Sequence, residues 1–129
     1  QLVNPFIGTD FTGNTYPGAQ APFGMVQLSP DNGLGGWDRI SGYFYPDSTI
    51  AGFSHTHLSG TGAGDLYDIL FMPVSLPYNE TAEGGLGIHS KFSHSDEEAS
   101  AGYYRVKLQD YNIYLHQQKY QDIQYYRPY

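Results

Sequence analysis

Residues 50–68 read IAGFSHTHLSGTGAGDLYD, and the rest of the chain is organised around this stretch. Its first half carries little charge and is rich in β-branched and aromatic residues, which predicts a β-strand. Because side chains alternate along a strand, we expect His55 and His57 on the same face. The glycines at positions 60, 62 and 64 predict a turn, and the continuous apolar run 69–72 predicts a strand buried on both faces.

The composition indicates one domain built mainly of strands and turns. The 129 residues include 16 Gly, 8 Pro and 13 Tyr, and charged residues make up only 15% of the chain. Such a chain is long enough for one hydrophobic core and short for two. No apolar run has the length of a membrane-spanning helix, so we expect no membrane span. The absence of Cys excludes disulfides and thiolate chemistry and leaves the compartment open.

The formal charge of −7 is unevenly distributed. Before His89, Arg39 is the only basic residue beside eight carboxylates, whereas five basic and five acidic residues balance each other after it. Nucleic-acid binding requires clustered Lys and Arg, so we expect no nucleic-acid partner. Polar neutral ligands such as sugars, or a cation, suit this surface better.

Three further segments have the alternation of half-buried strands: residues 25–29, 41–45 and 103–108. In the last of these, the even-numbered residues are expected to face inward. The acidic cluster 96–98 predicts a solvated turn or the start of a short helix. From residue 114 onward the chain is rich in Gln and Tyr and has no clear period, which is compatible with a poorly ordered tail.

Trp37, the only tryptophan, lies in a glycine-flanked segment beside Asp38 and Arg39. One interpretation makes it a lid over the core. The other makes it a sugar platform, because the C–H face of a pyranose packs on an aromatic ring while the neighbouring charged groups bind its hydroxyls.

His55 and His57 have three interpretations. They are hydrogen-bonded polar side chains on a half-exposed face, or ligands of a metal ion, or hydrogen-bonding groups of a polar ligand pocket. A metal site needs a third ligand, for which Asp65, His89 and His94 are candidates by type only. The glycine run does not match a phosphate-binding loop, because Asp65 follows Gly62 at the third place of the dinucleotide fingerprint and no Gly-Lys-Ser or Gly-Lys-Thr follows.

Short motifs spread over residues 3–113 share their order and spacing with a known family. They are VNPFIGT at 3–9, GNTYPGA at 13–19, PFGMVQLSPD at 22–31, GFSHTHLSGTG at 52–62, FSH at 92–94, EEA at 97–99 and GYY at 102–104. Together they resemble the N-terminal domain of the glycoside hydrolase family 92 mannosidases.

The resemblance implies an all-β fold, an antiparallel β-sandwich that packs on a C-terminal α-helical barrel. It also implies an exported, periplasmic or cell-surface protein that acts as a calcium-dependent, exo-acting, inverting α-mannosidase on N-glycans or mannans. Inversion needs two carboxylates separated widely enough to admit a water molecule. In the family these carboxylates and most of the calcium ligands come from the helical domain, so we expect no catalytic residue and no metal ligand in this chain.

The resemblance also implies roles for individual residues and a division of the chain. Trp37 and Asp38 would help to line the mannose subsite, and the segment 55–62 would be mainly structural. The domain would cover residues 1–113, with a divergent tail over residues 114–129.

The resemblance covers only about the first half of the family's N-terminal sandwich. A truncated sandwich would expose sheet edges and an apolar face. We therefore expect this chain to associate with a second copy or another chain, or to form a smaller sandwich.

Three functions remain open from the sequence. The first is the N-terminal part of an α-mannosidase, which contributes substrate contacts through Trp37, Asp38, His55 and His57 but is inactive alone. The second is a stand-alone carbohydrate-binding β-sandwich module that uses Trp37. The third is a metal protein that uses the pair His55 and His57.

Overall fold

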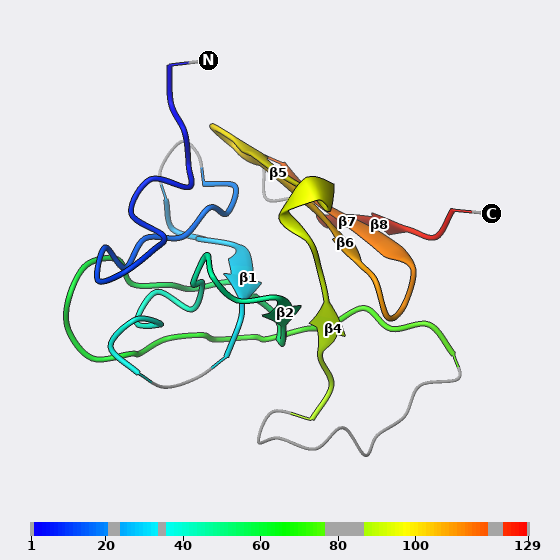
Figure 1. Cartoon of the computed structure of the whole chain (residues 1–129), viewed down its shortest axis with the longest axis horizontal. Coiled ribbons are helices and arrows are strands. Elements are labelled where there is room, and N and C mark those ends of the chain that lie inside the picture. Colours follow the sequence, from blue (N-terminus) through cyan, green and yellow to red (C-terminus); the bar gives the residue numbers. More distant parts are fainter. Residues whose placement is uncertain (1, 21–23, 34–35, 77–86, 119–122, 129) are drawn as a thin grey trace.

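The protein forms three antiparallel sheets and no α-helix among the residues described by this computed structural model, which are 2–20, 24–33, 36–76, 87–118 and 123–128 (Figure 1). Two sheets are two-stranded: β1 (Ser29–Asp31) pairs with β3 (Gly52–Ser54), and β2 (Thr49–Ile50) pairs with β4 (Ser90–Lys91). The third has the order β5-β6-β7-β8, with β5 at Glu97–Ser100, β6 at Tyr103–Leu108, β7 at Ile113–Gln118 and β8 at Ile123–Tyr126. A short 3₁₀ helix, η1 (His94–Asp96), precedes β5. The prediction of an all-β, antiparallel sandwich fold is confirmed.

The core lies between the four-stranded sheet and a loop-rich layer, which comprises the described residues of 2–76 and contains β1 to β3 (Figure 1). Along β6, Tyr104, Val106 and Leu108 are fully buried while their neighbours are partly exposed, as the alternation predicts. Leu115 of β7 adds to this face. The loop-rich layer contributes Leu28, Tyr43, Ile50 and Phe53 to the cluster.

Side-chain hydrogen bonds hold much of the loop-rich layer in place of strand ladders. The amide of Asn32 donates to the carbonyl of Thr49 at 2.7 Å and accepts from the backbone of Phe44 at 2.6 Å. The predicted strand over residues 41–45 is wrong, because this backbone binds the Asn32 side chain and backbone groups of loop residues such as Thr9, and not a neighbouring strand. The predicted strand over 25–29 is also misplaced, since β1 begins at Ser29.

The segment 69–72 is not the buried strand that its apolar sequence predicts. Ile69 is 76% exposed, and only Phe71 pairs with β3, through an isolated bridge to Phe53. The backbone of Ile69 has a φ of 55°. This left-handed conformation interrupts an extended chain, so the strand does not form.

The prediction of a poorly ordered tail is wrong for residues 114–118 and 123–126, which form most of β7 and all of β8. The Gln and Tyr residues hide a period of two, in which Ile113, Leu115 and Gln117 are buried. On the other face, the rings of Tyr114 and Tyr126 stack with centroids 5.3 Å apart. The remaining tail positions, 119–122 and 129, lie outside the described residues.

Candidate functional site

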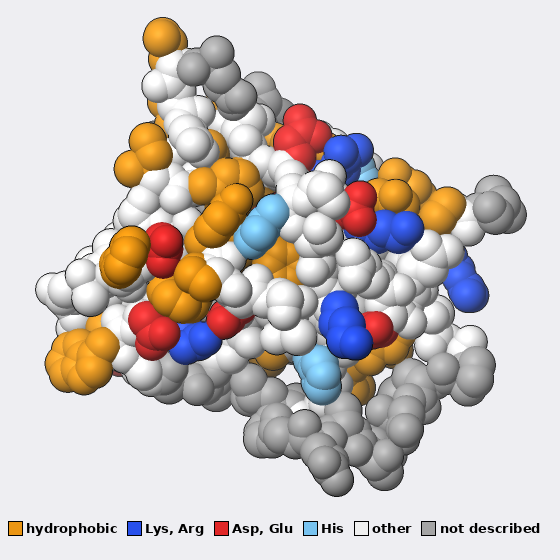
Figure 2. Space-filling model, in the orientation of Figure 1, with side chains coloured by type: hydrophobic (Ala, Val, Ile, Leu, Met, Phe, Trp, Pro, Cys, Tyr) orange, Lys and Arg blue, Asp and Glu red, His pale blue; other side chains and the backbone are white. Residues whose placement is uncertain are grey.

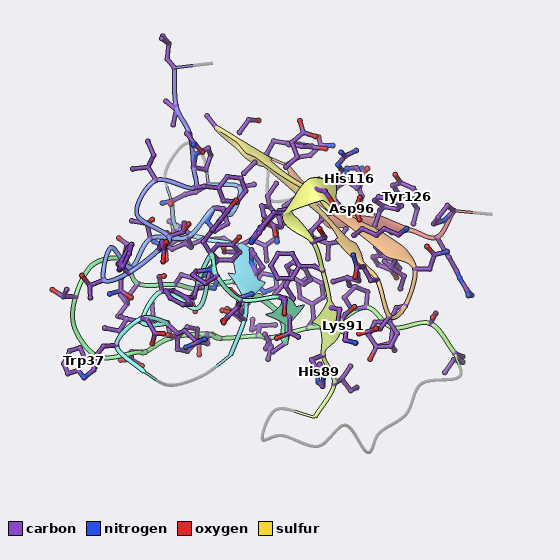
Figure 3. All side chains as sticks on the ribbon, viewed as in Figure 1. Trp37, His89, Lys91, Asp96, His116 and Tyr126 are labelled. Atoms are coloured by element: carbon purple, nitrogen blue, oxygen red, sulfur yellow. The ribbon has the colours of Figure 1, made fainter. Side chains whose placement is uncertain are left out.

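A groove of about 310 Å³ opens on the loop-rich layer. One wall is formed by Gly36, Trp37 and Ile40, and the other by the backbone of residues 62–64. The Trp37 side chain points outward at the edge of the molecule (Figure 3), and it is 74% exposed. This exposure contradicts the interpretation of Trp37 as a lid over the core and leaves one ring face available to a ligand.

Arg39 fixes the Trp37 wall through three hydrogen bonds. Its Nε and Nη2 donate to the two carboxylate oxygens of Asp47 at 2.8 and 2.5 Å, and its Nη1 donates to Asp38 Oδ2 at 2.8 Å. The hydrogen bond with Asp47 is the main cause that raises the pKa of Arg39, so this residue stays charged. A bidentate Arg–carboxylate pair gives a well-defined geometry, and the wall is therefore ordered before any ligand binds.

One carboxylate oxygen of Asp38, Oδ2, accepts a hydrogen bond from Arg39, and the other, Oδ1, lies near the groove. Within the described residues Oδ1 makes no hydrogen bond, and it lies over Gly36, where a Cβ would come within 2.5 Å of it. A glycine at position 36, which lines the groove, therefore leaves room for this oxygen beside it. The prediction that groups Trp37 with Asp38 is compatible with this geometry.

His57 is buried in the core and does not reach the groove. Its side chain is fully enclosed, with Nε2 2.8 Å from Asp31 Oδ1 and 3.0 Å from Ser54 Oγ. Nδ1 lies 2.6 Å from the carbonyl oxygen of Gln27, which only accepts, so Nδ1 donates this hydrogen bond. The expectation that His57 binds substrate is therefore not supported, because its polar atoms are already bound inside the protein.

His55 has different surroundings from His57. Its Nδ1 lies 2.9 Å from the carbonyl of Ile69, and its ring contacts that of Phe71 at 5.8 Å. The two imidazoles do not form the predicted pair, because β3 ends at Ser54 and the alternation of a strand does not continue through residues 55–57. Neither His55 nor His57 lines the groove.

The metal-site hypothesis is not supported by the described residues. Within them, no three His, Cys, Asp or Glu side chains come together as a metal-binding group. The candidate third ligands are separated: His94 contacts Glu97, and His89 lies near the carbonyl of Gly87. Among the described residues, none of the candidate ligands therefore stands in a group of three.

A buried carboxylate that the sequence did not indicate lies on β5. Glu97 was expected in a solvated cluster, but its side chain is only 1% exposed. It accepts hydrogen bonds from the hydroxyls of Tyr43 at 2.9 Å and Tyr104 at 2.6 Å, and it pairs with His94 Nδ1 at 2.5 Å. Burial, followed by the charge of Glu97, raises the pKa of both phenols, which therefore remain donors. The missed signal is the period of two, which places Glu97 on the same face as Ala99.

Comparison with known proteins identifies the family. The profile of the "Glycosyl hydrolase family 92 N-terminal domain" matches residues 2–117. The chain belongs to glycosyl hydrolase family 92. The suspected resemblance is therefore confirmed.

Solved structures of family 92 proteins share the fold. A family 92 α-mannosidase from Bacteroides thetaiotaomicron, in complex with mannoimidazole, is 43% identical with a TM-score of 0.87, and the match covers 98% of this chain and 18% of that chain. A family 92 inverting mannosidase from Bacteroides thetaiotaomicron VPI-5482 is 27% identical with a TM-score of 0.60, over 90% of this chain and 16% of that chain. This chain thus spans less than a fifth of these family 92 enzymes.

One curated family relative is described as an "Uncharacterized secreted glycosidase" of Arthroderma benhamiae. It is 38% identical over 62 residues, which are 48% of this chain and 8% of that protein. Within the described ranges of this chain, no helix is both long and apolar enough to span a bilayer.

Proposed function

We propose that this chain is the N-terminal part of an exo-acting, inverting α-mannosidase of the α-1,2 type, and that its groove contacts the terminal mannose of an N-glycan or mannan. Membership of family 92 supports the enzyme class. The observation that supports a substrate contact within this chain is the exposed ring of Trp37, held at the edge of the groove by the bonds of Arg39.

The groove offers a sugar two kinds of contact. The indole of Trp37 presents an apolar face on which the C–H groups of a mannose ring can pack. Asp38 Oδ1 lies beside Gly36 of the groove wall, where it would accept a hydrogen bond from a sugar hydroxyl. The volume of about 310 Å³ is at the lower end of small-molecule sites, which are roughly 300–1,000 Å³. We therefore assign the groove to one sugar ring rather than to a chain of them.

The carboxylates nearest the groove do not suit inverting hydrolysis. The mechanism needs one carboxyl group as acid and another as base, about 6.5–9.5 Å apart across a water molecule. Asp47 accepts from Arg39 through both carboxylate oxygens and Asp38 accepts through Oδ2, so Asp38 Oδ1 is the one oxygen of these two groups without a hydrogen bond among the described residues. We therefore propose that the acid, the base and the calcium ligands come from a C-terminal helical domain of a longer polypeptide.

Titration with mannose tests the substrate contact. We expect the fluorescence of Trp37 to change saturably at millimolar mannose, since a shallow single-ring site binds weakly. Asp38→Ala should weaken binding, whereas Phe11→Ala, at an exposed aromatic residue that does not line the groove, should not. A flat signal in the wild-type chain would refute the contact.

Turnover of an aryl α-mannoside in the presence of calcium tests the proposal that the catalytic groups come from another domain. The chain alone is expected to be inactive. Clear hydrolysis by the purified chain would overturn this proposal. The alternative, a stand-alone carbohydrate-binding module, would be favoured if the chain binds mannose and no hydrolysis occurs even when the remainder of the polypeptide is supplied.

We further propose that the full protein is exported and acts in the periplasm or at the cell surface. The secreted character of the curated relative supports export.

A further inference from the structure

The two walls of the groove are joined by one side chain, that of Tyr67. The residue follows the glycine wall, 62–64, by three positions. Its hydroxyl donates to the carbonyl of Ile40 at 2.5 Å and lies 3.2 Å from the carbonyl of Arg39. Ile40 belongs to the other wall, and Arg39 lies between Ile40 and Trp37 in the sequence. Burial raises the pKa of Tyr67, so its phenol remains a donor at neutral pH.

The backbone around Tyr67 adopts an unfavourable conformation to place this side chain. Leu66, Tyr67 and Ile69 have φ angles of 76°, 57° and 55°, in the left-handed region that residues other than glycine rarely occupy. Thr56 stabilises this turn, because its carbonyl accepts from the Tyr67 amide at 3.1 Å and its hydroxyl from the Asp68 amide at 3.0 Å. Such conformations persist only where the surroundings over-determine them, and they cluster at functional sites.

The residues around Tyr67 also hold its hydroxyl in one position. A Cβ on Gly64 would come within 3.1 Å of the Tyr67 hydroxyl, so the glycine at this position leaves space for it. The Tyr67 ring packs edge-on against His57 at 6.1 Å. His57 is bound in turn to Asp31 of β1. The ring that carries this hydroxyl is therefore held by contacts that continue through His57 to Asp31 in the buried interior.

We propose that Tyr67 is a positioning residue that sets the spacing between the Trp37 wall and the glycine wall, and thereby the fit of a single sugar ring. Tyr67 acts through Ile40 and Arg39 and does not itself touch the ligand. The consequence for sugar binding rests on the proposed function of the groove, whereas the spacing of the walls does not.

Tyr67→Phe tests the proposal in the 129-residue chain, because it removes one oxygen and keeps the ring against His57. We expect the fluorescence anisotropy of Trp37 to fall, its quenching by acrylamide to rise, and mannose affinity to drop about tenfold. Tyr125→Phe is the matched control, since the Tyr125 side chain is exposed and its hydroxyl has no hydrogen bond among the described residues. This control should leave all three readouts unchanged.

Gly64→Ala tests the same spacing from the other wall, should Tyr67→Phe fail to fold. The added methyl crowds the Tyr67 hydroxyl and should also loosen Trp37. Gly33→Ala is the control, because it adds a methyl to open space at a residue that does not line the groove, and it should leave the anisotropy of Trp37 unchanged. Unchanged Trp37 anisotropy and quenching in Tyr67→Phe, or in Gly64→Ala if the first does not fold, would overturn the positioning role. Loosened Trp37 in a protein that never binds mannose would support that role and refute the sugar site.

Discussion

His57 is the single residue whose loss should destabilise the loop-rich layer most. Its imidazole is buried against Asp31, whose second carboxylate oxygen, Oδ2, already has no partner among the described residues. His57→Ala would leave the whole carboxylate buried and unpaired, which typically costs about 3–5 kcal/mol. Urea unfolding measures this loss. His55→Ala is the control and should lower the free energy of unfolding much less, because His55 lies nearer the surface. Equal losses in the two variants would show that the buried contact of His57 with Asp31 does not stabilise the layer.

His116 gives the domain a dependence on pH that can be isolated by substitution. Burial, and then the charge of Arg105, lowers the pKa of His116 below its ordinary value of 6.5. Between that lowered value and 6.5, the unfolded chain binds a proton that the folded protein does not, so the free energy of unfolding decreases as the pH falls. Above 6.5 this contribution is fully present.

The measurement compares urea midpoints of wild type and His116→Gln at about pH 7.5 and pH 5.5. The substituted protein should lose less stability on acidification than the wild type does, because the other titrating groups are common to both. An equal or larger loss in His116→Gln would show that His116 does not supply this pH dependence.

At the scale of elements, β7 is the strand whose importance the sequence conceals most. Leu115 is fully buried in the middle of β7. Leu115→Ala removes three carbon atoms from the core and should cost about 2–5 kcal/mol. Gln118→Ala, at the exposed end of the same strand, should change stability by no more than about 0.5 kcal/mol. If thermal unfolding shows that Leu115→Ala and Gln118→Ala both lower stability only slightly, the tail does not contribute to the core.

The strand β6 could be predicted from the sequence, because its inward residues are large and apolar and its outward residues are polar or charged. For β7 and β8 the same periodicity was hidden, because residue type does not distinguish the two faces. The polar Gln117 is buried, whereas the aromatic Tyr114 is partly exposed. Propensity gives little guidance where the tertiary environment determines which side chains are buried.

The candidate site was predicted only in part. Trp37 and Asp38 could be singled out because a lone Trp beside charged residues in a glycine-rich segment suits a sugar. The pairing of His55 with His57 failed because the sequence does not show that β3 ends at Ser54. Tyr67 was missed because its position depends on a left-handed backbone, which a sequence of non-glycine residues does not signal.

At the scale of the whole molecule, open strand edges and exposed apolar side chains predict self-association. Among the described strands, β5 and β8 each pair with only one neighbour in the four-stranded sheet. Hydrophobic side chains also lie on the surface of the loop-rich layer (Figure 2), including Ile7, Phe11 and Met25. Unpaired edges and apolar patches favour pairing with another chain. Sedimentation velocity should show dimers or larger species that increase with protein concentration, and a single monomer at all concentrations would contradict this.

The contacts of Glu97 make the two layers depend on each other. Its carboxylate binds Tyr43 of the loop-rich layer and Tyr104 of the four-stranded sheet, and its partner His94 lies 2.7 Å from the carbonyl of Tyr45. Neither layer can separate without stripping a charged group of its donors inside the protein, so partial opening should be as costly as complete opening. Backbone amides in β1 and in β6 should therefore exchange their hydrogens for deuterium through one common, cooperative event, although these strands belong to different sheets.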